Sequence, residues 1–405
     1  MSRPNLLFLT QRLPYPPIKG EKIRPLQILH YLRQWYDVHL GCLIDDPADW
    51  QHADTIRALC RDTHIAGMNP KLARLLCLRG LLTGESLSVV FFRDRGLQAW
   101  VRQVVERVRP EVVFVNSSNM APYVLDLPRT GMRVVDLADV DSEKWRAYAD
   151  AARGPMRWVY RREWRCVAAL ERRIAEECDL ASFVSDAEAA LFTALAPARA
   201  HKIRGVSSGV DFRYFDPAPG YPAVYNAALP TFVFTGTMDY PPNVDAVTWF
   251  ATDLLPLIRQ RHAEARFYVV GANPVPAVQA LARLPGVHVT GRVPDVRPYL
   301  AHATAGVAPM RIARGIQNKV LEAMAMGKAV IATPGALEGI EAEPGRDLIL
   351  AQDATGIAAA ACRMIEQPGE AAAIGTAARR LVVERYDWPV RLARYDDILR
   401  PGARA

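Results

Sequence analysis

The chain has 405 residues, half of them hydrophobic, with a formal net charge of +7 and a pI near 9.1. No stretch approaches the roughly 18 consecutive apolar residues of a transmembrane helix, so the composition predicts a soluble globular chain long enough for two domains. The six cysteines form no CxxC pair and have no metal-ligand spacing with histidine. We therefore expect reduced thiols in the cytoplasm, with neither a disulfide framework nor a metal site.

The chain begins with a short apolar run, Leu6 to Leu9, which Gln11 and Arg12 close too early for a secretory signal. We interpret it as the first buried strand. Strand-like apolar runs then alternate with helical stretches in two series. In the first half they are 5–10, 38–44, 111–115, 132–137 and 180–185; in the second half they are 231–236, 265–271, 287–291, 305–308, 329–333 and 347–351. This alternation predicts an α/β fold with two Rossmann-like domains, each a parallel sheet covered by helices.

Two stretches of the first half are basic and apolar. Residues 71–82 combine lysine and arginine with leucines, and residues 153–173 interleave arginines with Trp158, Tyr160 and Trp164. Such segments can lie on an anionic membrane surface, or they can be core-facing helices with solvated arginines. Nucleic acid is the weakest interpretation, because no binding motif accompanies the charge. We expect no nucleic-acid partner.

A segment rich in proline and glycine, Asp216 to Pro222, separates the two series and predicts a hinge. We expect an N-terminal domain over residues 1–215, a linker over 216–228, a C-terminal domain over 229–385 and a final helix over 386–405. A ligand cleft is expected between the domains.

The segment Gly315 to Gly327 predicts a helix with an anion site at its start. Backbone N–H groups of Ile316, Gln317 and Asn318 would face an anion there. Lys319 and Glu322 stand three residues apart and share one helix face, so an ammonium could meet phosphate while a carboxylate accepts ribose hydroxyls. Alternatively, this is an ordinary amphipathic helix with a surface Lys–Glu pair. Gly327 predicts the left-handed residue that ends the helix.

Four motifs, in chain order, carry a resemblance to a known family. They are Lys19-Gly20-Glu21-Lys22, Ser208-Gly209-Val210-Asp211, Phe234-Thr235-Gly236 and the segment Glu322 to Ala332. The chain resembles glycosyltransferase family 4 enzymes of the GT-B fold nearly end to end. Residues 19–24, 136–145 and 236–243 look more narrowly like the sugar transferases associated with exosortase (PEP-CTERM) and exopolysaccharide gene clusters.

The resemblance implies a retaining hexosyltransferase that needs no cofactor or divalent metal and uses a nucleotide-diphosphate sugar, UDP- or GDP-linked, as donor. The acceptor would be a glycan or a lipid-linked sugar. In this fold the C-terminal domain binds the donor, the N-terminal domain binds the acceptor, and the sheets of both face the cleft. The last helix crosses back to the first domain. The implied location is cytoplasmic, with peripheral contact at the inner face of the membrane.

The resemblance also implies roles for individual residues of the donor site. Glu322 would bind the ribose, and Gly315 to Asn318 with Lys319 the diphosphate. Arg292 and Val293 would border the base, although Arg292 could be a plain surface cation. Gly236 would let the donor approach the strand end. Asn243 would lie beside the donor or simply cap the helix that follows Pro242.

Two departures from the family pattern affect the donor site. Arg314 stands where many members have a glutamate eight positions before Glu322, and no Arg and Lys pair follows the Phe234-Thr235-Gly236 strand. Arg311 and Arg314 become candidate phosphate cations, or are surface charges. The missing glutamate keeps open a catalytically silent GT-B binding or scaffold protein, and the same fold also serves sugar-nucleotide epimerases and phosphorylases.

In the first domain, relatives often place a His or Asp at the cleft wall after the strand that here spans 132–137. Ala138 stands where the His would often be, and Asp139 lies beside it. Asp139 would orient the sugar or the acceptor, or it is an N-terminal charge on the next helix. Gly20, Lys22 and Arg24 would line the acceptor side, or Lys22 and Arg24 are solvated residues of a helix first turn.

Overall fold

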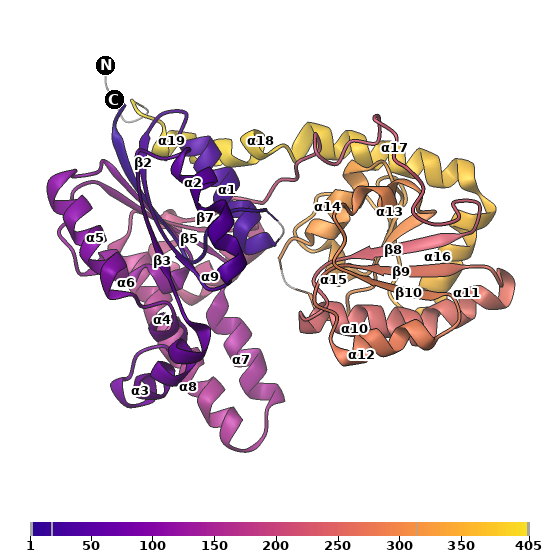
Figure 1. Ribbon diagram of the computed structural model, residues 1–405, viewed down its shortest axis with the longest axis horizontal. Helices are drawn as coiled ribbons and strands as arrows, with labels where there is room; N and C mark the ends of the chain where they lie inside the picture. Colours follow the sequence, from indigo (N-terminus) through magenta and orange to yellow (C-terminus); the bar gives the residue numbers. More distant parts are fainter. Residues whose placement is uncertain (1–2, 18, 314, 403–405) are drawn as a thin grey trace. The chain divides into compact units, whose positions relative to one another are not determined.

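The computed structural model describes residues 3–17, 19–313 and 315–402. The chain forms two compact units. The N-terminal unit comprises residues up to Ser207 together with those from Leu392 onward, and the C-terminal unit comprises Ser208–Arg391. Each unit is an α/β structure built on one parallel sheet (Figure 1). The predicted fold class is confirmed.

The N-terminal unit has a seven-stranded sheet in the order β3-β2-β1-β4-β5-β6-β7, with every neighbouring pair parallel. Its strands are β1 Asn5–Thr10, β2 Asp37–Ile44, β3 Asp62–Gly67, β4 Val112–Asn116, β5 Met132–Ala138, β6 Leu180–Phe183 and β7 Ile203–Gly205. The central strands β1 and β4 are largely apolar and almost entirely buried, as parallel strands covered on both faces require. The sequence analysis missed the two edge strands, β3 and β7, because one is polar and the other has only three residues.

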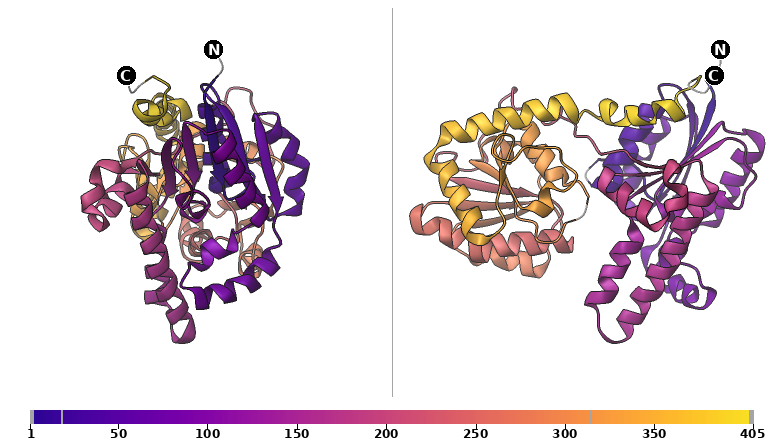
Figure 2. Two further views of the ribbon diagram at one scale, coloured as in Figure 1. Left: turned by 90° about the vertical axis from the view of Figure 1, so that its left-hand side faces the viewer. Right: turned by 180° about the vertical axis from the view of Figure 1, so that it is seen from behind.

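Helices cover both faces of this sheet (Figures 1 and 2). They are α1 Gly20–Leu32, α2 Ala53–Arg57, α3 Pro70–Thr83, α4 Leu87–Phe91, α5 Arg95–Arg107, α6 Pro122–Leu125, α7 Asp141–Ala151, α8 Gly154–Glu177 and α9 Asp186–Leu195, with 3₁₀ turns at Pro47–His52, Ser118–Met120 and Pro197–Lys202. Helices α7 and α8 form a hairpin that projects from the body of the unit (Figure 2).

The C-terminal unit has a six-stranded parallel sheet in the order β10-β9-β8-β11-β12-β13. Its strands are β8 Thr231–Thr235, β9 Arg266–Val270, β10 Val287–Gly291, β11 Ala305–Ala308, β12 Val330–Ala332 and β13 Ile349–Leu350. All six strands were predicted. Its helices are α10 Pro241–Trp249, α11 Leu255–Arg261, α12 Pro276–Ala280, α13 Arg297–Ala301, α14 Asn318–Ala325, α15 Pro334–Leu337, α16 Ala354–Glu366 and α17 Pro368–Arg385, with a π-helical turn at Phe250–Leu254 and a 3₁₀ turn at Leu281–Arg283.

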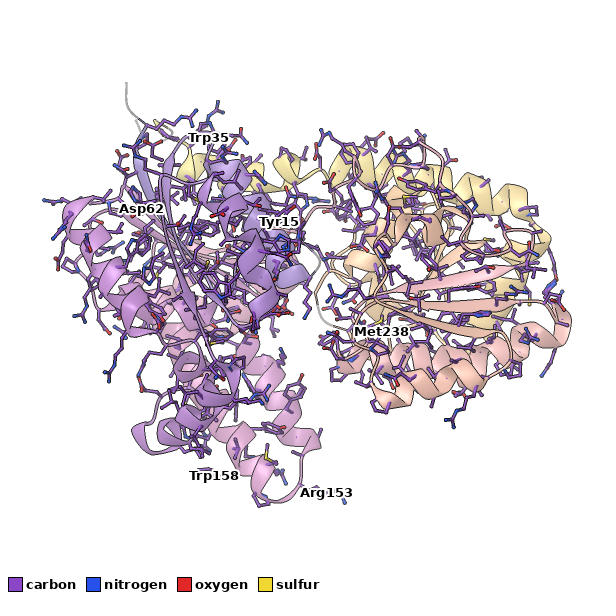
Figure 3. All side chains as sticks on the ribbon, viewed as in Figure 1. Tyr15, Trp35, Asp62, Arg153, Trp158 and Met238 are labelled. Atoms are coloured by element: carbon purple, nitrogen blue, oxygen red, sulfur yellow. The ribbon has the colours of Figure 1, made fainter. Side chains whose placement is uncertain are left out.

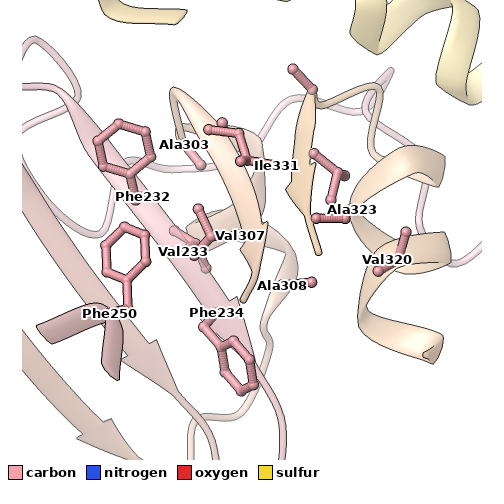
Figure 4. Close-up of a cluster of buried hydrophobic side chains, with 14 of the residues drawn as sticks. Phe232, Val233, Phe234, Phe250, Ala303, Val307, Ala308, Val320, Ala323 and Ile331 are labelled. Carbon is pink, nitrogen blue, oxygen red and sulfur yellow. The ribbon is translucent and has the colours of Figure 1, made fainter. Parts of the chain in front are cut away.

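Helix α14 is anchored to this sheet by its apolar face. Val320 and Ala323 pack toward Val307 and Ile331 of the central strands, as Figure 4 shows, and each of these side chains is at most 3% exposed. Burial on this scale contributes about 1.5–3 kcal/mol for each fully buried aliphatic side chain. Gly327 follows the helix with φ 67°, so the predicted left-handed stop is confirmed.

The end of the chain is less regular than the single helix expected over 386–405. It consists of α18 Trp388–Leu392, a 3₁₀ turn Ala393–Tyr395 and α19 Asp396–Leu399. The last two pieces belong to the N-terminal unit. There Tyr395 donates to or accepts from Ser182 at 2.6 Å, and Arg204 forms an ion pair with Asp397.

Candidate functional site

The start of α14 provides the amides of the candidate anion site. Gly315 has φ 65°, a left-handed conformation that favours glycine, and Gln317 is the N-cap residue with an extended backbone. The helix therefore begins at Asn318, later than predicted, and Ile316 and Gln317 precede it. The first-turn amides are those of Asn318 and Lys319, since the Val320 amide already donates to the Gln317 carbonyl at 2.9 Å.

Lys319 and Glu322 both reach the carboxyl end of β8. The Lys319 ammonium lies 5.2 Å from the centroid of the Phe234 ring and donates to Gln317 Oε1 at 3.0 Å. Glu322 forms a side-chain hydrogen bond with Thr235, the last residue of β8. Sequence reasoning missed Thr235, although its place at a strand end in a parallel sheet was a usable signal.

Burial shifts the pKa values of both charged groups toward their neutral forms. Loss of solvent lowers the pKa of Lys319 to about 8, and the Glu322 carboxylate opposes that shift. Loss of solvent likewise raises the pKa of Glu322 to about 7, against opposing contributions from Lys319 and Thr235. The ammonium thus faces an amide oxygen and an aromatic ring in a place where an anion would restore the energy lost by desolvation.

Two glycines are packed tightly against neighbouring atoms at the end of β8. A Cβ on Gly271, which follows β9, would lie 1.7 Å from the Gly236 carbonyl oxygen, so only glycine fits there. A Cβ on Gly236 would lie 2.7 Å from Asn243 Nδ2. The predicted glycine at this strand end is therefore required by packing, and its neighbourhood is formed by the first turn of α10.

Asn243 does not cap the helix, and that alternative was wrong. Tyr240 is the N-cap residue, and Asn243 is the third residue of α10. Its side chain is buried, Nδ2 donates to the Thr237 carbonyl at 2.9 Å, and Oδ1 has no hydrogen-bond partner among the described residues. A buried acceptor of this kind is expected to find a donor, which a bound ligand could supply.

The arginine candidates of this unit lie in different surroundings. Arg311 is exposed, stacks over Trp249 at 5.1 Å and pairs with Asp245, both on α10. Arg292 is exposed directly after β10, two strands away from β8 along the same sheet edge, while Val293 packs against the core. Arg314 lies outside the described residues.

The predicted cations of the N-terminal unit are buried ion-pair partners. Lys22 Nζ lies 2.6 Å from Asp49, and Arg24 binds Asp136 through two nitrogens at 2.7 and 2.8 Å. Burial would lower the pKa of Arg24, but the Asp136 carboxylate outweighs it and raises the pKa above its ordinary value. The alternative that Lys22 and Arg24 are solvated was wrong, because each is at most 5% exposed. Gly20 is the exposed first residue of α1.

Asp136 is the centre of a polar network that the sequence analysis did not find. Besides Arg24, it accepts hydrogen bonds from Asn116 and Ser182 at 3.0 Å and from Tyr395 at 3.4 Å. A carboxylate buried inside a sheet is stable only when several donors satisfy it.

Asp139 lies after β5, at the carboxyl end of the sheet of the N-terminal unit. Burial, aided by Asp141 and Glu188, raises the pKa of Asp139 to about 7, and Oδ1 lacks a hydrogen-bond partner in the part of the chain that is described. The residue precedes α7 and provides no cap for it, since Val140 is the N-cap residue and no side chain caps the helix. The carboxyl group is thus perturbed in the way that catalytic acids often are.

Over residues 3–17, 19–313 and 315–402, no three His, Cys, Asp or Glu side chains gather so that they could hold a metal ion. The described helices include none whose length and hydropathy would let it cross a bilayer.

Comparison with known proteins gives a domain match and a shared fold. Residues 229–367 match the family described as glycosyl transferases group 1. No curated protein sequence matches the chain.

Many solved structures share this fold, among them the following three, which cover nearly the whole chain. They are Alr3699/HepE of Anabaena in complex with UDP (16% identity, 98% of this chain and 99% of that chain, TM-score 0.67), sucrose-phosphate synthase of Thermosynechococcus elongatus (17%, 98% and 98%, 0.69), and WaaG, a glycosyltransferase involved in lipopolysaccharide biosynthesis (16%, 98% and 100%, 0.66). At these identities the likeness establishes the fold, which is GT-B.

Proposed function

The GT-B fold and the group 1 domain support a glycosyltransferase, and from that premise we propose that the chain transfers a sugar from a nucleotide-diphosphate donor to a hydroxyl of a glycan or lipid-linked acceptor, with retention of anomeric configuration. The observation that carries the proposal is the placement of Lys319 and Glu322 at the end of β8. A desolvated ammonium beside first-turn amides suits a diphosphate, and a carboxylate one turn on suits two vicinal hydroxyls.

The proposed chemistry needs stabilisation of the departing diphosphate. Charge develops on that group as the sugar leaves, so a fixed ammonium and helix amides lower the barrier more than they strengthen donor binding. Lys319 and the amides of Asn318 and Lys319 would do this. Gly236 would allow the donor close to the strand, and the free Oδ1 of Asn243 would accept a donor hydroxyl or amide hydrogen.

The base is proposed to be uracil. Alr3699/HepE has been solved with UDP and with UDP-glucose, and both structures share the fold over nearly the whole chain. Arg292 and Val293, placed directly after β10, would border the base. A GDP-linked donor is the second candidate.

The acceptor would bind to the N-terminal unit. Asp139, with its raised pKa and unpartnered oxygen, would orient the acceptor or the sugar. Lys22 and Arg24 would act by fixing the local structure, because their charges are paired within the unit. The donor phosphate itself could take the proton of the attacking hydroxyl, so the two-carboxylate arrangement of a glycosidase is not needed.

We place this reaction in cell-surface polysaccharide biosynthesis, with the enzyme in the cytoplasm and close to family 4 and the exosortase-associated transferases. The motifs of residues 19–24, 136–145 and 236–243 support this assignment. Six free cysteines support a reducing compartment.

A panel of UDP-, GDP- and ADP-sugars in a thermal-shift assay tests the donor site, because a ligand of the folded state raises the melting temperature. We expect UDP compounds to give the largest shift in the wild type and in the control variants Lys328→Ala and Glu384→Ala. The shift should be lost in Lys319→Ala and Glu322→Ala. Equal shifts in all five proteins would refute the site, and binding without any glycoside product would favour the catalytically silent alternative.

A further inference from the structure

The C-terminal unit has a cavity of about 700 Å³ that the proposed donor site does not use. Its walls come from the segment 217–221, the ends of α13 and α14, and the second half of α17. Helices α13, α14 and α17 lie on the same face of the sheet (Figure 1). Ligand pockets in proteins have volumes of about 300–1,000 Å³. The cavity is therefore large enough for a small metabolite.

This cavity lies at the edge of the sheet opposite to the donor site. His302 comes shortly before β11 and Lys328 shortly before β12, so both lie at the amino ends of parallel strands. Lys319 and Glu322 lie instead at the carboxyl end of β8, the edge at which Figure 3 labels Met238. Helix α14 has 8 residues and is about 12 Å long, so the two sites lie at its opposite ends.

Close contacts fix the walls of the cavity. A Cβ on Gly375 of α17 would lie 2.1 Å from the Gly327 carbonyl oxygen, so α17 packs tightly against the end of α14. Arg379 of α17 donates to the Ala325 carbonyl and forms an ion pair with Asp216 at 2.7 Å. This guanidinium is thus satisfied within the unit, and it joins α17 to α14 and to the residues that precede the segment 217–221.

Lys328 lines this cavity without an internal partner. Its side chain is partly buried, and its ammonium forms no hydrogen bond or ion pair with any residue that the structure describes. Burial lowers the pKa of Lys328, and no described carboxylate offsets that shift. Cations near helix ends commonly bind carbonyl oxygens, but for α14 Arg379 has this role. The Lys328 ammonium therefore retains an attraction for an anion from outside.

Arg380 adds a second cation to the cavity. It is exposed on α17 and forms no ion pair within the described ranges. Asp347, whose pKa is lowered mainly by Arg346 and in smaller part by Arg380, is already paired with Arg346 at 2.8 Å. Of the described residues that line the cavity, Glu384 alone carries a carboxylate. A guanidinium and an ammonium from two elements suit a phosphate group.

The remaining wall of the cavity is largely apolar. Tyr221, Met326 and Val383 line it, and the Tyr221 hydroxyl donates to the Asp216 carbonyl at 2.8 Å, which fixes the ring. A ring-shaped molecule can pack against these side chains while its phosphate contacts the two cations. Inorganic phosphate alone would leave this wall uncovered.

We propose that the cavity binds a phosphate monoester carried on a ring, with Lys328 and Arg380 at the phosphate and Tyr221 and Met326 at the ring. Sugar phosphates and nucleoside monophosphates share this chemistry. The bound ligand would connect the segment 217–221 with α14 and α17, and it would stabilise the C-terminal unit by mass action. The site does not depend on the proposed donor site.

Methyl NMR of the full chain, with ¹³C-labelled methionine methyl groups, tests the proposal. Met326 reports on the cavity and Met238 on the carboxyl end of β8, and the variants Met326→Leu and Met238→Leu assign the two signals. The probes are glucose 6-phosphate, UMP, inorganic phosphate and glucose. We expect a saturable shift of the Met326 signal with a monoester, at a Kd about tenfold or more below that of inorganic phosphate, and no shift with glucose. The tighter monoester distinguishes a sugar phosphate from a nucleoside phosphate.

Three substitutions test the assigned roles. Lys328→Gln and Arg380→Gln should each raise the Kd of the monoester about tenfold or more, because each removes a charge-assisted contact with the phosphate. Glu384→Gln should lower the Kd, because it removes a charge of the same sign as the ligand. The controls Arg283→Gln and Glu264→Gln change exposed charges elsewhere on the unit and should bind like the wild type.

The proposal would be overturned if neither monoester gave a saturable Met326 shift, if glucose gave an equal shift, or if Lys328→Gln and Arg380→Gln bound like the wild type. UDP is titrated into the same proteins with Met238 as the reporter. Its affinity should be retained in both variants, and Lys319→Ala should leave the response of Met326 to the monoester unchanged. A failed donor site is thus distinguished from a failed monoester site.

Discussion

Cations withdrawn from solvent serve different purposes in the two units, fully buried in the N-terminal unit and partly buried at Lys319. In the N-terminal unit, Arg24 and Lys22 meet carboxylates at 2.7 and 2.6 Å, and Arg24 belongs to a network of several further hydrogen bonds. In the C-terminal unit, the Lys319 ammonium donates to an amide oxygen and faces a ring. A buried cation that is paired with a carboxylate of the same unit contributes to the stability of that unit. Lys319 has a carboxylate neighbour, Glu322, but that carboxylate only partly offsets the desolvation of the ammonium, so the ammonium retains an attraction for an anion from outside.

The largest effect on stability is expected from breaking the ion pair between Arg24 and Asp136. Arg24→Ala leaves Asp136 as a buried charge without its main partner, and we expect the free energy of unfolding of the N-terminal unit to fall by about 3–5 kcal/mol. Urea unfolding followed by a probe in that unit measures it. The UDP affinity of the folded protein should stay the same. A small loss of stability would show that the network does not depend on this pair.

Replacement of Lys319 should have the opposite effects, leaving stability unchanged and weakening UDP binding. Lys319→Ala takes away a desolvated ammonium, so we expect no loss of stability but a loss of about 2 kcal/mol in UDP binding, roughly thirtyfold in Kd. Calorimetric titration measures the affinity, with Lys328→Ala, at the other end of α14, as the control. Wild-type affinity in a folded Lys319→Ala protein would contradict the comparison.

The affinity for a nucleoside diphosphate should depend on pH in a direction set by Lys319. Its pKa of about 8 in the free protein means that the ammonium loses its proton above pH 8, while a bound diphosphate would raise the pKa again. Binding above pH 8 should therefore take up a proton and weaken by up to about tenfold per pH unit. Titrations in buffers of different ionisation enthalpy detect the proton. Lys319→Arg should bind without this dependence between pH 7 and 9.

The last prediction concerns Asp139. Its folded pKa of about 7 exceeds the ordinary value, so the ionised carboxylate destabilises the native state increasingly as pH rises from about 4 to 7. Asp139→Asn should therefore raise the melting temperature of the N-terminal unit at pH 8 relative to the wild type, with little difference at pH 4. If Asp139 orients the acceptor, product formation should fall while UDP affinity is retained. A lower melting temperature at pH 8 would indicate that the carboxylate is satisfied in its ionised form.

The fold could be predicted largely from the sequence because the buried strands are continuous apolar runs separated by helical stretches. The two edge strands were not predicted, because β3 is polar and partly exposed and β7 has only three residues. The position of Lys319 and Glu322 on one helix face also followed from spacing alone.

What the sequence could not predict were contacts between residues far apart. The pairing of Arg24 with Asp136 spans 112 positions, and no local pattern distinguishes a buried arginine from a solvated one. The hydrogen bond between Glu322 and Thr235 likewise depends on where two elements meet. Asn243 follows Pro242 in the sequence, and this position suggested a helix cap. In the structure α10 begins earlier, and Tyr240 is its N-cap residue.

The return of the chain to its first unit has a consequence for biosynthesis. Tyr395, which completes the polar network around Asp136, lies 259 positions after it, and residues from Leu392 onward belong to the N-terminal unit. A ribosome must therefore finish nearly the whole polypeptide before the earliest part can reach its final state. The C-terminal unit, an uninterrupted stretch from Ser208 to Arg391, has all its residues available earlier. Although it is translated second, it can mature first.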